Sequence, residues 1–146
     1  MEADEDPFED RHAGAACPDV SVRVEEFNAE PAYAVHTELC NYLTARQTTQ
    51  RDIHPGETIK VRVWHFMLTA PNPAEAHLAI DVAGLRVLNE RIPIPQAAGL
   101  IRAEVPVVRA IPAGAPVYFH LHNHGQNVYG LIELSAGPQT KVGTPQ

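Results

Sequence analysis

The chain has 146 residues, of which 45% are hydrophobic, and a formal net charge of −7. This length and hydrophobic content predict one globular domain and exclude two. Six of the 18 acidic residues lie among the first ten, so the other 136 residues hold 12 acidic and 11 basic side chains. This near-neutral remainder offers no basic stripe, which excludes a nucleic-acid surface. No apolar run is long enough for a membrane span, and the N-terminus lacks the basic and then apolar pattern of a signal peptide.

The two ends of the chain differ from its middle. Residues 1–18 are acidic and then small, which predicts a flexible arm, and residues 137–146 contain no apolar run, which predicts a flexible tail. Residues 19–136 are therefore expected to form the folded domain.

Within this domain, apolar and polar residues alternate with period two, the pattern of half-buried strands. The strongest run is 58–68, where Ile59, Val61 and Val63 share one face. Turns rich in proline and glycine separate about eight such runs, and no segment of ten residues has a helical period. The pattern predicts an all-β fold, an antiparallel β-sandwich of the jelly-roll type.

Three local signals refine this prediction. Ala83-Gly84 between two strands predicts a hairpin, and residues 125–127 lead us to expect that the last two strands also pair. Pro106 predicts an edge position or a bulge for the strand over 100–110, because proline cannot donate a ladder hydrogen bond.

The chain has two cysteines, Cys17 and Cys40, on either side of an alternating run. A disulfide between them would indicate an oxidising, extracytoplasmic compartment, periplasmic or secreted. The alternative is a pair of unrelated buried thiols. Their spacing does not resemble a CxxC redox or zinc pair.

The most distinctive segment is 118–124, which contains three histidines at every second position. Strand alternation directs Phe119 and Leu121 into the core and predicts one shared outer face for Tyr118, His120, His122 and His124. Two such imidazoles can bind one zinc or copper ion if an adjacent strand supplies another ligand. The candidates for this additional ligand are His65, His77 and Glu133. The alternative is a polar, weakly basic outer face without metal.

Trp64 and Phe66 form a second distinctive feature, because they follow Lys60 on the outer face of their strand. An exposed aromatic ring offers a stacking surface to a sugar, whereas a sole tryptophan in a small sandwich usually belongs to the core. A bulge near His65 would allow both.

The amides of Asn123 and Asn127 suit a neutral, hydroxyl-bearing ligand, although asparagine is also favoured in turns. No nucleophile elbow, P-loop or dinucleotide-binding motif is present. The sequence therefore favours a binding protein over an enzyme, and any enzyme here would depend on the histidines.

The succession of short strands over 19–136, closing with residues 127–134, resembles the galactose-binding-like and carbohydrate-binding modules. This resemblance implies a small module that often recognises glycans, sometimes with a structural calcium. The chain has no evident cluster of aspartates for calcium.

Three hypotheses follow. The first is a non-enzymatic, extracytoplasmic module that binds a glycan or a protein surface. Its ligand-binding residues would be Trp64, Tyr118, His120, His122, Asn123, His124 and Asn127. The second is a zinc- or copper-binding protein or metalloenzyme, with ligands His120, His122, His124 and His65. The third is a structural subunit that forms homo-oligomers through its strand edges.

Overall fold

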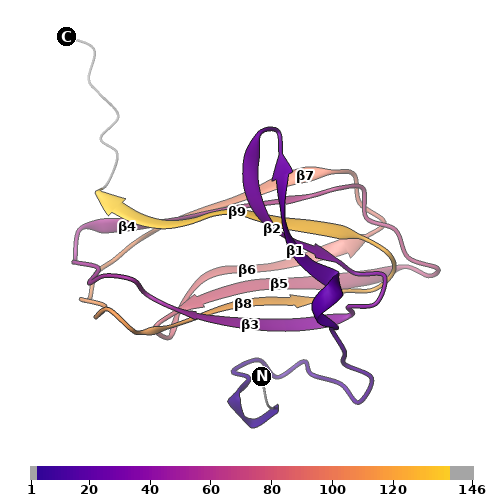
Figure 1. The fold of residues 1–146 in the computed structure, drawn as a ribbon, viewed down its shortest axis with the longest axis horizontal. Helices are drawn as coiled ribbons and strands as arrows, with labels where there is room; N and C mark the ends of the chain where they lie inside the picture. The colour runs from indigo at the N-terminus through magenta and orange to yellow at the C-terminus, as the bar shows by residue number, and fades with distance from the viewer. Residues whose placement is uncertain (1–2, 139–146) are drawn as a thin grey trace.

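The computed structural model describes residues 3–138, which form two packed antiparallel sheets (Figure 1). Sheet A has five strands in the order β1-β2-β9-β4-β7, and sheet B has four in the order β3-β8-β5-β6. The strands of sheet A are β1 (Val22–Phe27), β2 (Glu30–His36), β9 (Val128–Pro138), β4 (Glu57–His65) and β7 (Gly99–Pro106). Those of sheet B are β3 (Tyr42–Thr48), β8 (Pro116–His122), β5 (Ala74–Val82) and β6 (Leu85–Ile94).

This arrangement confirms the predicted β-sandwich. Strands β2 to β9 occur in the orders 2-9-4-7 and 3-8-5-6, which is the topology of an eight-stranded jelly roll, and β1 adds one edge strand. Two one-turn 3-10 helices, η1 (Ala3–Glu5) and η2 (Asp19–Ser21), precede β1. No helix among residues 3–138 is long and apolar enough to cross a membrane.

The core lies between the sheets because alternate residues of each strand face inward. Ile59, Val61 and Val63 of β4 are buried, as predicted, and they belong to the same core cluster as Phe119 and Leu121 of β8. Burial of these apolar side chains is the main stabilising term for such a fold.

The local predictions have mixed outcomes. The hairpin at Ala83-Gly84 is confirmed: both residues have positive φ, and β5 pairs with β6. The edge position is also confirmed, since β7 ends at Pro106 and borders sheet A. The expected pairing of the last two strands is wrong, because β8 belongs to sheet B and β9 to sheet A, so residues 123–127 connect the two sheets.

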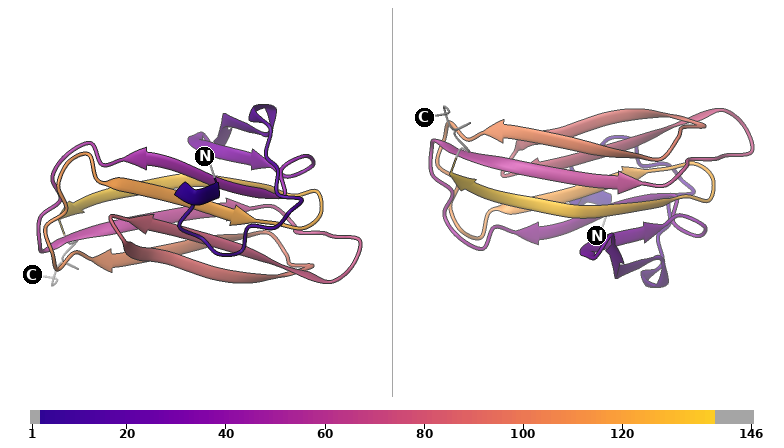
Figure 2. Two further views of the ribbon diagram at one scale, coloured as in Figure 1. Left: turned by 90° about the horizontal axis from the view of Figure 1, so that it is seen from below. Right: turned by 90° about the horizontal axis from the view of Figure 1, so that it is seen from above.

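The N-terminal segment lies on the outer side of sheet B (Figure 1), and it crosses β8 in the view from below (Figure 2, left). The disulfide between Cys17 and Cys40 joins the end of this segment to the β2–β3 connection, which excludes two unrelated thiols. Asn41 adds two side-chain hydrogen bonds, accepting from Ala16 N at 2.9 Å and donating to Gly14 O at 3.0 Å.

The flexibility of residues 1–18 stays a prediction. In the structure, part of this segment contacts the sandwich through the disulfide and the hydrogen bonds of Asn41. Of the predicted tail, Gly137 and Pro138 extend β9 and pair with β4. Residues 139–146 lie outside the described residues.

Candidate functional site

The outer face of sheet B presents the histidines in register with neighbouring strands. His120 lies between Thr44 of β3 and Ala79 of β5, and His122 lies between Tyr42 of β3 and His77 of β5. Three imidazoles from two strands therefore occupy adjacent positions, and His77 is the one candidate of the three that the topology brings to this face.

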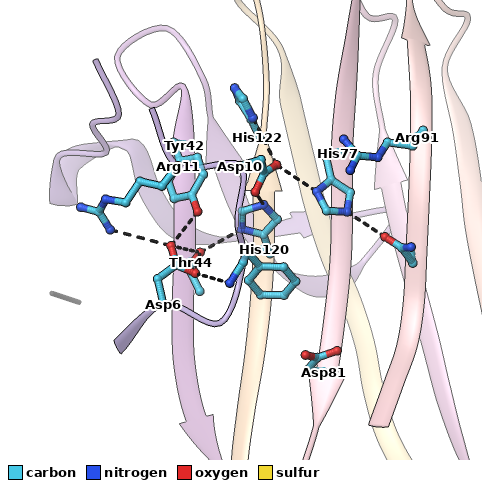
Figure 3. Close-up of polar contacts among 12 residues, drawn as sticks. Asp6, Asp10, Arg11, Tyr42, Thr44, His77, Asp81, Arg91, His120 and His122 are labelled. Carbon is cyan, nitrogen blue, oxygen red and sulfur yellow. Dashed lines mark hydrogen bonds and ion pairs between the residues drawn. The ribbon is translucent and has the colours of Figure 1, made fainter. Parts of the chain in front are cut away.

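The N-terminal arm, which we define as residues 3–16, covers this face with alternate side chains. Phe8 is 6% exposed and stacks on His120, with ring centroids 4.0 Å apart. His12 stacks on His122, with centroids 4.9 Å apart. Asp10 lies between these two rings in the arm sequence and points at the histidines (Figure 3). His120 is thereby completely buried.

The Asp10 carboxylate is the centre of this cluster. Its Oδ2 lies 2.9 Å from Nδ1 of His77 and 3.2 Å from Nδ1 of His122, and its Oδ1 lies 2.9 Å from Nε2 of His120. The Asp10–His120 contact has a short distance without hydrogen-bond geometry, so both of its atoms are buried without a hydrogen-bond partner. Nε2 of His122 is likewise buried and unpartnered.

The other nitrogens of two imidazoles have defined partners. Nε2 of His77 lies 2.7 Å from Oδ1 of Asn89, and Nδ1 of His120 lies 2.8 Å from the hydroxyl of Thr44. These contacts hold each ring so that its remaining nitrogen faces Asp10.

A second carboxylate, Asp6, supports the arm beside this cluster (Figure 3). It accepts hydrogen bonds from the hydroxyl of Tyr42 at 2.6 Å and from that of Thr44 at 3.1 and 3.2 Å. The guanidinium group of Arg11 forms an ion pair with Asp6 at 3.8 Å.

Burial and hydrogen bonding oppose each other in this cluster. Burial alone would raise the pKa of Asp10, but its contacts with His77, His120 and His122 outweigh that effect and hold the pKa well below its usual range. For His120 and His122 burial is the largest effect and lowers the pKa of both, which favours neutral imidazoles. Burial, followed by the hydrogen bond to Asp6, raises the pKa of Tyr42.

Four further residues from the sequence predictions lie apart from Asp10. His124 is exposed after the end of β8, with its ring 5.1 Å from that of His122. His65 is buried in sheet A, where its Nδ1 donates to Phe66 O at 2.9 Å. Glu133, also in sheet A, accepts from Arg62 at 3.3 Å. Tyr118 occupies the outer face of sheet B two residues before His120, opposite Asp81.

Asn123 and Asn127 are buried in the β8–β9 connection, where their amides bond to the protein. Asn123 donates to Thr37 at 2.8 Å and accepts from the hydroxyl of Tyr129 at 2.5 Å. Asn127 donates to Thr69 O at 3.0 Å. Both amides thus hold the turn together.

The outer face of sheet A has a different character, because it forms an open groove of about 600 Å³ with aromatic walls. Phe66, which is 48% exposed, makes edge contacts with Phe27 at 5.5 Å and with Trp64 at 6.3 Å. Trp64 is half-buried on this outer face and does not belong to the core. The bulge expected near His65 does not occur there: the register of β4 with β9 shifts between Arg62 and Val63, where Ile132 of β9 is the extra residue.

Small residues lie beneath the Phe27 wall of this groove. A Cβ on Gly130 would come within 2.1 Å of the Phe27 ring, so the ring lies directly over this glycine. Ala34, which pairs with Gly130, and Ala32 are also buried. A β1–β2 turn with positive φ at Asn28 and Ala29 precedes β2 and follows Phe27 directly.

Charged side chains border the aromatic rings. Arg62 donates two hydrogen bonds to Glu30, at 2.9 and 3.0 Å. Nearby, Glu25 accepts from Arg23 and lies 2.8 Å from Nε2 of His36. Planar groups held in this way present fixed hydrogen-bonding edges to the groove.

The chain matches no protein-family model and no curated protein. Among solved structures it is similar to the CBM22-1 xylan-binding domain from Paenibacillus barcinonensis, at 10% identity and a TM-score of 0.35. The alignment covers 86% of this chain and 90% of that domain. A TM-score this low does not establish a shared fold, so membership in a carbohydrate-binding family stays a prediction.

Proposed function

We propose that this domain is a non-enzymatic, extracytoplasmic binding module that accepts a neutral sugar chain in the outer groove of sheet A. The observation on which the proposal rests is the combination of aromatic walls and fixed charged edges in one open groove. Aromatic rings stack on the apolar face of a pyranose, while carboxylates and guanidinium groups hydrogen-bond its hydroxyls.

The charge of the groove favours a neutral ligand over an acidic one. Glu25, Glu26 and Glu30 line it, and its one arginine, Arg62, is already paired with carboxylates. An anionic sugar would therefore meet like charges without a free guanidinium group. The Cys17–Cys40 disulfide supports an oxidising compartment, where such ligands occur.

This proposal moves the ligand away from the face expected from sequence. The histidine face of sheet B is covered by the arm, whereas Trp64 lies on the opposite sheet beside an open groove. Binding of a protein surface and formation of homo-oligomers stay predictions.

A glycan array containing neutral and uronic-acid polysaccharides tests the proposal. We expect hits among neutral glycans, and titration of a hit with Trp64→Ala should show affinity about tenfold lower, because a stacked ring contributes about 1 kcal/mol or more. Tyr118→Ala is the matched aromatic control on sheet B and should bind as the parent does. An array without neutral hits, or equal binding by Trp64→Ala, would contradict the proposal.

A further inference from the structure

Side chains of the types that bind metal ions meet between the arm and sheet B, on the face of the sandwich opposite the groove. Asp10 of the arm, His77 of β5 and His120 of β8 each offer one ligand atom, and these atoms lie within 4.8 Å of one another. Both histidines are buried, and the close-up view shows all three side chains pointing toward one another (Figure 3).

The partner of His77 determines which of its nitrogens is available. Oδ1 of Asn89 can only accept, so Nε2 of His77 must donate to it across 2.7 Å. In a neutral imidazole the other nitrogen, Nδ1, then has a lone pair. That lone pair faces the Asp10 carboxylate at 2.9 Å.

The same reasoning applies to His120. The hydroxyl of Thr44 donates to Asp6, and it therefore accepts from Nδ1 of His120 at 2.8 Å. Nε2 of a neutral His120 then has a lone pair as well, and it faces Oδ1 of Asp10 at 2.9 Å without a hydrogen bond. A fully buried imidazole favours this neutral form.

With both imidazoles in this neutral form, two lone pairs and a carboxylate converge in one place. Without a positive charge between them, these atoms would repel one another and would also have lost their hydration. Hydrogen bonds from the far nitrogens, here to Asn89 and to Thr44, are the usual way in which proteins orient metal-binding histidines. Thr44 is itself held by Asp6, which extends the support to a third layer.

We propose that Asp10, His77 and His120 bind a zinc-type divalent cation that ties the N-terminal arm to sheet B. Two imidazole nitrogens and one carboxylate oxygen suit zinc, whereas calcium and magnesium prefer oxygen ligands. In a tetrahedral site with bonds of 2.0–2.1 Å, ligand atoms lie roughly 3.3 Å apart, so the two Asp10–histidine contacts of 2.9 Å would lengthen slightly around the ion. His122 lies outside this group of three, although its Nδ1 is 3.2 Å from Oδ2 of Asp10.

This site differs from the one expected from the HxHxH segment. His120 is retained, but His65 is buried in the other sheet and His124 is exposed beyond the end of β8. The decisive addition is Asp10, which lies 67 residues before His77 in the chain. Because the metal site and the groove lie on different sheets, the metal proposal is independent of the proposed sugar binding.

To test the proposal, the untagged, full chain is first freed of metal with a chelator and is then titrated with Zn²⁺. We expect one Zn²⁺ per chain by calorimetry and by elemental analysis. In Asp10→Ala and His120→Ala the affinity for Zn²⁺ should fall by a factor of about 100 or more. Asp10→Ala is the key variant because the arm lies outside the two sheets, and circular dichroism verifies its fold. His54→Ala, in an exposed turn, is the matched control. This variant and the separate variant His124→Ala should both bind Zn²⁺ as the parent does.

Trypsin cleavage after the exposed Arg11 provides a second readout of arm docking. Zn²⁺ should slow this cleavage in the parent chain but not in Asp10→Ala, and Mg²⁺ or Ca²⁺ should have no effect. The proposal fails if the parent binds no Zn²⁺ or if Asp10→Ala binds it equally well. It also fails if His124→Ala abolishes binding, or if bound Zn²⁺ leaves the cleavage rate unchanged.

Discussion

The two outer faces of the sandwich are built from the same kind of alternating strand, yet one is covered and the other is open. On sheet B, histidines and other polar side chains lie beneath the arm, and His120 is completely buried. On sheet A, the Phe27 ring covers Gly130, and Phe66 stays 48% exposed.

This difference has a physical origin in the side chains of each face. The polar side chains on sheet B have hydrogen-bonding atoms that need partners. The carboxylates of Asp6 and Asp10 in the arm are such partners. The aromatic rings of sheet A already contact one another and leave a concave apolar surface. Strand alternation therefore tells which face a residue occupies, whereas the covering segment decides whether that residue is available to a ligand.

The largest expected effect concerns the covalent anchor of the arm. Replacing Cys17 and Cys40 together by alanine should lower the free energy of unfolding by about 3 kcal/mol, because the bridge closes a loop with a sequence separation of 23. Urea denaturation of the variant measures this loss, and the parent protein under reducing conditions is the chemical control. A loss below about 1 kcal/mol would show that the anchor adds little to the covered face.

The next effect concerns Phe8, the apolar contact of the arm. Phe8→Ala should lower the free energy of unfolding by about 2 kcal/mol, because the ring is 6% exposed, stacks on His120 and lies beneath Arg86 at 4.6 Å. Urea denaturation again measures it, with Phe8→Leu as a milder control. An unchanged stability would mean that the arm does not stabilise sheet B, which would remove the contrast between the faces.

Much of the fold was predictable because it depends on local patterns. The alternation in 58–68 assigned the buried face of β4 correctly, and Ala83-Gly84 and Pro106 predicted a hairpin and an edge. The pairing of the last two strands was not predictable from their turn. The 123–127 connection has the composition of a hairpin, but a buried network around Asn123 holds it as a crossover between the sheets.

The candidate sites were predictable only in part. The outward alternation of His120 and His122 was evident from the strand, and His77 was among the proposed neighbours. Asp10 was missed because it lies in an acidic segment that resembles a disordered tail. The regular spacing of Asp6, Phe8, Asp10 and His12, with one aromatic residue among acids, was the available signal of an extended segment that docks on a surface.

The smallest expected effect concerns Phe66, the matched aromatic residue on the open face. Phe66→Ala should lower the free energy of unfolding by about 1 kcal/mol, since about half of its surface is already exposed. The same urea denaturation compares it directly with Phe8→Ala. A loss as large as that of Phe8→Ala would mean that Phe66 serves mainly to hold Phe27 and Trp64 in place. The groove would then be a structural cluster, whereas a small loss accompanied by weaker glycan binding is what an exposed stacking surface requires.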